Sequence, residues 1–256
     1  MSIRRVNRGS SHSYIDTETG DRIPGVTTIL NEGLPKPALI NWAANTTAAY
    51  AIDRWDELTE LSPSRRLKEL QGARFADRDA AANRGTQIHR LAERLSRGEQ
   101  VDVPDALRGH VESAVQFLDD WNVQPAITEA VVVNYTHRWA GTLDLIADLA
   151  DSQRWLLDYK SSRSGAYGDT AYQLAAYRNA EYFRRGPNDP EEPMIPVDAT
   201  GVVWIRADGY ELYPYETGPA VYREFLYIAQ VAAAADRCKD YKGEALTVPT
   251  RQGVPA

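Results

Sequence analysis

Two stretches of β-forming residues flank a short polar segment near the middle of the chain. Residues 142–149 and 155–160 run apolar or alternate between apolar and polar positions, and residues 150–154 between them read Ala-Asp-Ser-Gln-Arg. This pattern predicts a β-hairpin. If the turn is centred on Asp151, the two strands extend equally on either side of it.

The hairpin carries three charged side chains. In the register set by that turn, Asp144 and Asp158 face each other, with Cβ atoms roughly 4.5–5.5 Å apart. Lys160 follows Asp158 by two residues and therefore emerges on the same face. A solvated, salt-bridged edge hairpin is the ordinary interpretation of an isolated Asp-x-Lys triplet. Here both acids sit in mostly apolar runs, which favours burial, and buried acids need a metal or a cation.

The remaining pattern predicts an α+β chain with a mixed sheet. Ser62 is an N-cap candidate followed by Pro63, and residues 247–256 should be a loosely held tail. The expected elements, in order, are a hairpin over 12–30, a helix from Pro37 through Ala44, helices over 75–96 and 105–121, a strand over 127–135, a helix over 169–185, paired strands over 201–206 and 210–215, and a helix over 219–239.

Composition narrows the class of protein. The chain has 256 residues, of which 43% are hydrophobic and 25% charged, as in ordinary soluble domains. No apolar run reaches the roughly 18–20 residues of a membrane span, and no apolar segment follows the first arginines, so we expect a cytoplasmic protein with no membrane partner. Cys238 is the single cysteine. An intramolecular disulfide and a four-cysteine iron–sulfur cluster are therefore excluded.

The net charge of −7 argues against a protein that coats nucleic acid without specificity. It does not exclude a nuclease, because active-site acids add negative charge and basic residues can gather locally. Two basic clusters on expected helices are either phosphate contacts or solvated faces: Arg65, Arg66 and Lys68, and then Arg74, Arg78, Arg84 and Arg90.

Several polar residues outside the hairpin have ordinary interpretations when each is taken alone. His89 lies beside the apolar stripe of its helix, one turn after Gly85, and such a histidine is usually packed or exposed. Glu129 begins a strand, where a glutamate is normally exposed. Gln173 and Tyr177 are four residues apart and share a helix face; the ordinary reading is an exposed glutamine and a tyrosine at the edge of the core.

Taken together, these residues carry a family resemblance. The series Gly85-Thr-Gln-Ile-His89, Gly141-Thr-Leu-Asp144, Asp158-Tyr-Lys160 and Gln173-x-x-x-Tyr177 resembles the motifs of RecB-like nucleases in the PD-(D/E)xK superfamily, from about residue 83 to 182. The segments PGVTTIL (24–30) and LPKPALINWAA (34–44) are similar to phage-encoded exonucleases of that group. Related CRISPR-associated adaptation nucleases carry an iron–sulfur cluster, for which this chain lacks the cysteines.

The resemblance implies a fold and a division of the chain. The fold is the restriction-endonuclease-like αβββαβ core with a mixed central sheet and a helical N-terminal addition. The division is an N-terminal hairpin and helical region over 1–80, the nuclease core over 81–245, and a flexible tail over 246–256.

The resemblance also implies roles for individual residues. His89, Asp144, Asp158 and the main-chain carbonyl of Tyr159 would hold Mg²⁺ or Mn²⁺, which suit oxygen-rich sites with one imidazole. The catalytic residues would be Asp144, Asp158 and Lys160, with Glu129 as a further carboxylate that a second metal would use. The residues expected to contact DNA are Gln173, Tyr177, Ser161 and Lys36.

The function that follows is a metal-dependent DNA nuclease, with an exonuclease favoured, acting in DNA recombination or processing. DNA is the expected partner, a phage single-strand annealing or recombination protein is a further candidate partner, and a phage-encoded enzyme would work in the host cytoplasm. The alternative is a catalytically silent nucleic-acid-binding protein on the same fold. A glycosidase-like acid/base pair would explain the two aspartates but leaves His89, Lys160 and Gln173 without a role.

Overall fold

The computed structural model describes residues 2–8, 11–162 and 165–247, so most of the predicted tail, residues 248–256, lies outside the described residues. A five-stranded sheet in the order β12-β11-β8-β7-β4 forms the centre. Strand β11 runs parallel to β8, and the other pairs are antiparallel. The predicted α+β class with a mixed sheet is therefore confirmed. The bounds of these strands are β4 Gln124–Thr128, β7 Leu145–Asp148, β8 Arg154–Lys160, β11 Ala199–Arg206 and β12 Gly209–Pro214.

The central hairpin has the predicted register. Strands β7 and β8 pair Leu145 with Leu157 and Asp148 with Arg154, which centres the turn on Asp151. The first strand is shorter than predicted, because β7 begins only at Leu145. Thr142 ends a strand of a different sheet, and Leu143 and Asp144 lie between the two strands.

That second sheet has four strands in the order β10-β9-β5-β6, namely β10 Glu192–Pro193, β9 Tyr182–Arg184, β5 Val131–Asn134 and β6 Trp139–Thr142. Strands β4 and β5 follow each other in the chain, as do β6 and β7, so one long hairpin bends from the first sheet into the second. The single strand predicted over 127–135 is therefore two strands. Hydrogen bonds cross the bend from Glu129 N to Asp144 O and from Leu143 N to Ala130 O, both 2.9 Å long.

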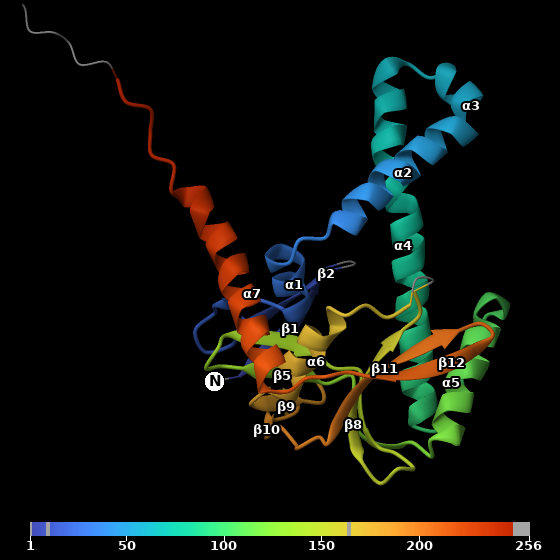
Figure 1. The fold of residues 1–256 in the computed structure, drawn as a ribbon, viewed down its shortest axis with the longest axis vertical. Helices are drawn as coiled ribbons and strands as arrows, with labels where there is room; N and C mark the ends of the chain where they lie inside the picture. The colour runs from blue at the N-terminus through green and yellow to red at the C-terminus, as the bar shows by residue number, and fades with distance from the viewer. Residues whose placement is uncertain (1, 9–10, 163–164, 248–256) are drawn as a thin grey trace, which may run out of the picture.

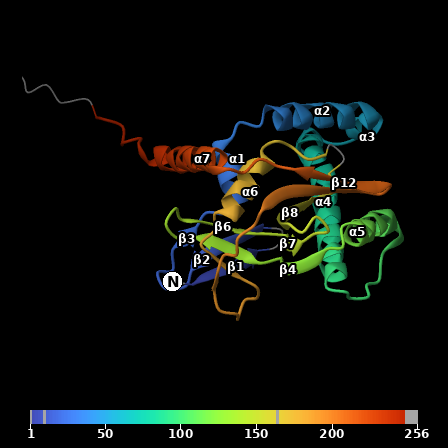
Figure 2. The same cartoon turned by 60° about the horizontal axis from the view of Figure 1, so that its bottom comes forward.

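An N-terminal sheet covers the second sheet. It consists of β1 Ile3–Arg8, β2 Ser11–Asp16 and β3 Arg22–Ile23. The buried side chains of Ile3 and Tyr14 pack against Val133 and Ala140 of β5 and β6. Figure 2 shows β1–β3 beside β6, at one end of the bent hairpin. The N-terminal segment is thus part of the body that holds the hairpin.

The chain after β3 differs from the prediction. Residues 24–30 were expected to form the second strand of the N-terminal hairpin, but they enter helix α1, Val26–Gly33. Val26, Ile29 and Leu30 are buried, and their spacing of three and four residues fits one face of a helix. The β-branched composition that favoured a strand is outweighed by this packing.

Helices cover both faces of the five-stranded sheet. Helix α4 (Pro63–Ser96), a 3₁₀ turn (Asp105–Leu107) and α5 (Arg108–Asp120) cover one face; α1, α6 (Thr170–Arg178) and α7 (Pro219–Arg237) cover the other. Leu145 packs toward α4 and α5, whereas its neighbour Ile146 packs on the opposite side. The helix predicted over 169–185 ends at Arg178, because the chain then turns to pair β9 with β5.

A helical arm extends from this body (Figure 1). It is formed by α2 (Pro37–Asp53), α3 (Trp55–Thr59) and the first half of α4. The helix predicted over 75–96 begins already at Pro63, after the N-cap candidate Ser62, so the domain boundary predicted at residue 80 falls inside α4. Helix α2 has no buried residues, and the core lies in the sheets. No helix among the described residues is both long and apolar enough to cross a membrane.

Candidate metal centre

The bend of the long hairpin places two carboxylates side by side. Glu129 lies between β4 and β5, and Asp144 lies between β6 and β7, on the two chain segments that hydrogen-bond across the bend. The backbone φ of Glu129 is +48°, a left-handed conformation that costs free energy in a residue with a side chain. Such a conformation persists only where the surrounding structure enforces it. Because both residues lie at the bend and outside the regular strands, their side chains can converge on one point.

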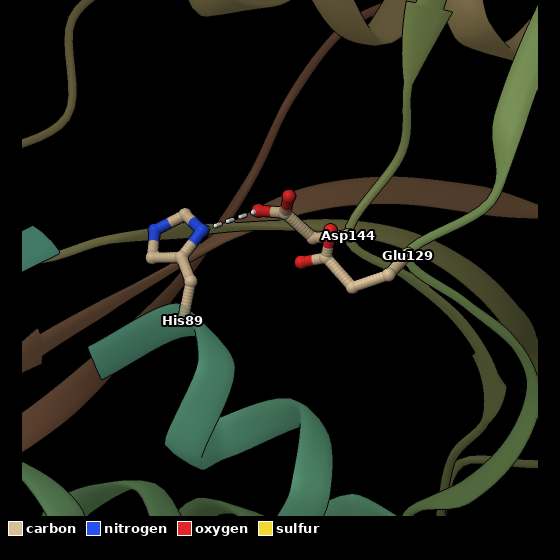
Figure 3. Close-up of side chains that lie close together, drawn as sticks. All are labelled: His89, Glu129 and Asp144. Atoms are coloured by element: carbon tan, nitrogen blue, oxygen red, sulfur yellow. Dashed lines mark ion pairs between the residues drawn. The ribbon is translucent and has the colours of Figure 1, made fainter. Parts of the chain in front are cut away.

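Helix α4 supplies the third member of the group. Ile88, Leu91 and Ala92 are buried against α5 and the sheet, which fixes the rotation of the helix and directs His89 toward the bend. His89 Nδ1 lies 3.4 Å from Asp144 Oδ2. Figure 3 shows the imidazole and the two carboxylates pointing toward one another. The ligand atoms of His89, Glu129 and Asp144 all lie within 4.8 Å of each other.

The three groups perturb one another electrostatically. Burial lowers the pKa of His89, but the adjacent Asp144 carboxylate outweighs burial and raises that pKa to about 9. Burial and then the charge of Asp144 raise the pKa of Glu129 to about 7. Burial also opposes ionisation of Asp144, yet His89 and Lys160 hold its pKa below the usual value. The group thus retains protons at neutral pH that a cation would displace.

A second polar group lies next to the first. Asp158 is 3% exposed; its Oδ2 lies 2.6 Å from Lys160 Nζ, and its Oδ1 accepts a hydrogen bond of 2.7 Å from Gln173 Nε2. Burial raises the pKa of Asp158 even though Lys160 opposes it. Burial lowers the pKa of Lys160, but Asp158 and Asp144 outweigh burial and raise it. The predicted sharing of one face by Asp158 and Lys160 is confirmed.

One residue joins the two groups. Tyr159 N donates a hydrogen bond of 2.8 Å to Asp144 Oδ2, so the strand that carries Asp158 and Lys160 also orients Asp144. The Tyr159 ring meets the His89 ring edge to face, with 6.0 Å between centroids. Asp158, predicted as a metal ligand, is outside the group of three and bound to Lys160 and Gln173. Its direct ligation, and that of the Tyr159 carbonyl, stay predictions.

Tyr177 was predicted to contact nucleic acid, and the structure contradicts this. Its side chain is 3% exposed and belongs to the core between the sheet and α6. Its ring lies directly over Gly141, where an added Cβ would be 2.3 Å from Tyr177 Cε1. Burial raises the pKa of this phenol well above its ordinary value. Tyr177 therefore supports the strand that leads to Asp144 and has no open face for a ligand.

Substituting Gly141 should destabilise the protein. In Gly141→Ala the methyl group would overlap the Tyr177 ring, and overpacking of this kind costs about 1–3 kcal/mol. Gly85→Ala is the matched control, because a Cβ there meets only Ser161 Oγ at 3.5 Å and alanine favours a helix. Urea unfolding measures both. Equal stability of the two variants would show that Tyr177 is not fixed over Gly141.

Two other predicted DNA contacts have identifiable surroundings. Lys36 Nζ donates to Asn31 Oδ1 at 2.8 Å and lies 3.5 Å from Asp169 Oδ2, so it links the start of the arm to the start of α6. Ser161 follows β8 and faces Gly85 of α4. Both are partly exposed, and their contact with DNA stays a prediction. Glu93, on the same helix as His89, forms an ion pair with Arg97.

A cavity of about 350 Å³ opens beside the metal-binding group, and its lining includes residues that the sequence did not single out as site residues. Arg5 comes from β1 and Thr142 from the end of β6. Thr142 lies within the Gly-Thr-Leu-Asp motif, so the motif could have identified it as a site residue. Arg5 lies in an ordinary strand pattern, and only its position in three dimensions reveals it. The lining consists of Arg5, Thr86, His89, Arg90, Glu93, Glu129, Thr142 and Asp144.

Comparisons with known proteins identify no family for this chain. No protein-family model matches it, and no curated protein matches it. One solved structure, described as "Crystal structure of SSO0001", is similar over 53% of this chain and 62% of that chain, with 15% sequence identity and a TM-score of 0.29. The chain therefore spans less than two thirds of that protein, and a likeness this weak carries no argument about fold or function.

Proposed function

We propose that this chain is a metal-dependent nuclease that hydrolyses phosphodiester bonds in DNA. The observation that carries the proposal is the convergence of His89, Glu129 and Asp144 at the hairpin bend, next to the ion pair of Asp158 with Lys160. Carboxylates that converge on one point repel each other unless a cation lies between them. A metal at this point, flanked by an ammonium group, suits a substrate that carries negative charge on phosphate oxygens.

The donor set fits a hard divalent cation. Two carboxylates and one imidazole offer the ligands that Mg²⁺ and Mn²⁺ accept, with the nitrogen favouring Mn²⁺. Glu129 would hold the ion together with His89 and Asp144, and Asp158 is the candidate for a further ligand. When bound, such an ion lowers the pKa of a water molecule and polarises a phosphate.

The residues of the second group position the charge that the reaction needs. Gln173 and Lys160 bind opposite oxygens of the Asp158 carboxylate, so Asp158 holds the ammonium group close to Asp144. The side chain of Lys160 is 32% exposed and can contact a substrate. It would orient the attacking water and offset the negative charge that develops on the phosphate in the transition state.

The order of elements supports the restriction-endonuclease-like core that the sequence motifs imply. Helix α4 carries His89, the bent hairpin and β8 carry the acids and the lysine, α6 carries Gln173, and β11 lies parallel to β8. If each bent arm of the hairpin counts as one strand, this is an αβββαβ order. Within this function we favour an exonuclease that acts in DNA recombination or processing. A phage single-strand annealing or recombination protein is the candidate partner.

The proposal is tested with two substrates. An end-labelled linear duplex and a closed single-stranded circle are incubated with Mg²⁺, with Mn²⁺ and with EDTA. Metal-dependent loss of the linear DNA with an intact circle would identify an exonuclease, and a cut circle an endonuclease. Binding of DNA without cleavage under either metal would leave the silent nucleic-acid-binding protein as the better account.

Metal affinity should rise with pH, because metal ligands must be deprotonated. The pKa of His89 is raised to about 9 and that of Glu129 to about 7, so the metal displaces one proton between pH 7 and 9 and a second below pH 7. We expect about a tenfold gain in affinity per pH unit above pH 7 and a steeper gain below it. Calorimetric Mn²⁺ titrations in buffers of different ionisation enthalpy count the protons. In Glu129→Gln the second proton released below pH 7 should no longer be observed. A metal affinity that does not change with pH would contradict the assignment of His89 and Glu129 as metal ligands.

A further inference from the structure

The cavity beside the metal-binding group is lined on one side by Arg5 of the N-terminal sheet. Three segments far apart in the chain line it: β1, helix α4, and the hairpin bend. We propose that Arg5 of β1 binds a phosphate oxygen of the substrate strand next to the reacting phosphodiester, so that the N-terminal sheet forms part of the substrate site. This inference rests on the proposed nuclease function and names the residue that anchors its substrate.

The packing of the N-terminal sheet aims Arg5 at the site. Arg5 pairs with Tyr14 across β1 and β2 and, at the strand period of two, shares a face with the fully buried Ile3. Tyr14 Oη lies 2.9 Å from Thr142 Oγ1. Arg5 Nη1 donates a hydrogen bond of 3.3 Å to the same hydroxyl. Thr142 precedes Asp144 by two residues, so these contacts hold the guanidinium at the edge of the metal-binding group.

The charges around the cavity fit a phosphate once a cation occupies the carboxylates. Glu129 and Asp144 would then be neutralised, and Glu93 is paired with Arg97. The lining would retain the positive charges of Arg5 and Arg90. Arg5 is exposed, and its hydrogen bond to a neutral hydroxyl leaves donors on the guanidinium, whose fork geometry matches phosphate oxygens. Arg5 also lies near enough to Glu129 to oppose the rise in that residue's pKa.

Neighbouring arginines in β1 provide a matched comparison. Arg4 is also exposed, but it points to the opposite face of the sheet from Arg5. Arg5→Gln and Arg4→Gln therefore each remove one positive charge, from adjacent positions. Arg5→Lys keeps the charge but loses the paired N–H donors of the guanidinium. Binding of a fluorescent linear duplex is measured over a range of salt concentrations with Ca²⁺, a divalent cation that oxygen ligands bind, so that the carboxylates are neutralised; kcat and KM are measured with Mn²⁺. Melting temperatures report the fold of each variant.

We expect Arg5→Gln to bind DNA about tenfold more weakly and to lower the slope of log affinity against log salt by about 0.9. Arg4→Gln should change affinity by less than about twofold, since it makes no phosphate contact. Arg5→Lys should keep the slope and lose part of the affinity. If Arg5→Gln does not fold, Arg5→Lys decides: reduced affinity supports the contact, and wild-type affinity and KM overturn it.

The outcomes separate the inference from the proposed function. Equal affinity and slope for Arg5→Gln and Arg4→Gln, in a protein that cleaves DNA, would overturn the inference alone. If DNA binding depends on Arg5 but the wild-type protein cleaves no DNA, the phosphate contact would be supported and the proposed nuclease function would be overturned. A wild-type protein that neither binds nor cleaves DNA would overturn both.

Discussion

Asp144→Asn should abolish metal-dependent cleavage, with a loss on the order of 10³-fold or more. Asp144 lies at the centre of the group: it contacts His89, its charge raises the pKa of Glu129, and it accepts the Tyr159 N–H. The substitution removes one negative charge and one metal-ligand oxygen. The amide oxygen of asparagine can still accept the Tyr159 N–H, so the fold should persist.

A readout independent of activity tests the same substitution. The carboxylate of Asp144 is what raises the pKa of His89 to about 9 against the effect of burial. In Asp144→Asn this pKa should fall below its wild-type value, as measured by NMR titration of the metal-free protein. Asp148→Asn is the matched control, because Asp148 lies four residues further along the same arm of the hairpin, at the end of β7, and pairs with Arg154 at the turn. Full activity of Asp144→Asn would show that Asp144 is not a residue of the active site.

Replacing Lys160 by methionine should have the second largest effect, because it removes the ammonium group and isolates a buried acid. We expect a loss of activity on the order of 10²–10³-fold, the scale of removing one group that stabilises transition-state charge. The stability cost should be about 1–3 kcal/mol. This lies below the 3–5 kcal/mol typical of a broken buried pair, because Lys160 is 32% exposed and water screens it.

The pH dependence of that variant has a definite sign. Burial already raises the pKa of Asp158 with Lys160 present, and without Lys160 the pKa rises further. A raised pKa in the folded state means that stability is lost as pH rises. Lys160→Met should therefore be destabilised more at pH 8 than at pH 5, as urea unfolding at the two pH values would show.

A double substitution separates the structural role from the catalytic one. Asp158→Asn combined with Lys160→Met removes both charges, so no isolated ion remains in the core, and most of the lost stability should return. Activity should not return, because the ammonium group is still absent. Recovery of cleavage in the double variant would mean that Lys160 serves only to balance Asp158.

The hairpin was predictable from sequence because side chains alternate with a period of two. Once the turn is centred on Asp151, the facing of Asp144 and Asp158 and the shared face of Asp158 and Lys160 follow from local geometry. The register of β7 with β8 agrees with this prediction. The pattern did not reveal that the strand breaks before Leu145, since β6 and β7 are one apolar run in sequence and only pairing with different partners divides them.

Features set by tertiary packing could not be predicted in the same way. Glu129 was expected at the start of a strand, whereas the bend gives it a left-handed backbone and brings it into the metal-binding group. Tyr177 was assigned to nucleic acid, although its ring fills the space above Gly141. Arg5 carried no local signal, because its role depends on a contact with Thr142, 137 residues away.

The central claim is that a metal held by His89, Glu129 and Asp144 supports hydrolysis of DNA. One Mn²⁺ titration, read in the same samples by EPR and by release of label from linear duplex, tests it most directly. We predict that cleavage rises in proportion to the Mn²⁺ occupancy of a site that is absent in Asp144→Asn. Cleavage without occupancy of that site, or an occupied site with the duplex intact, would contradict it.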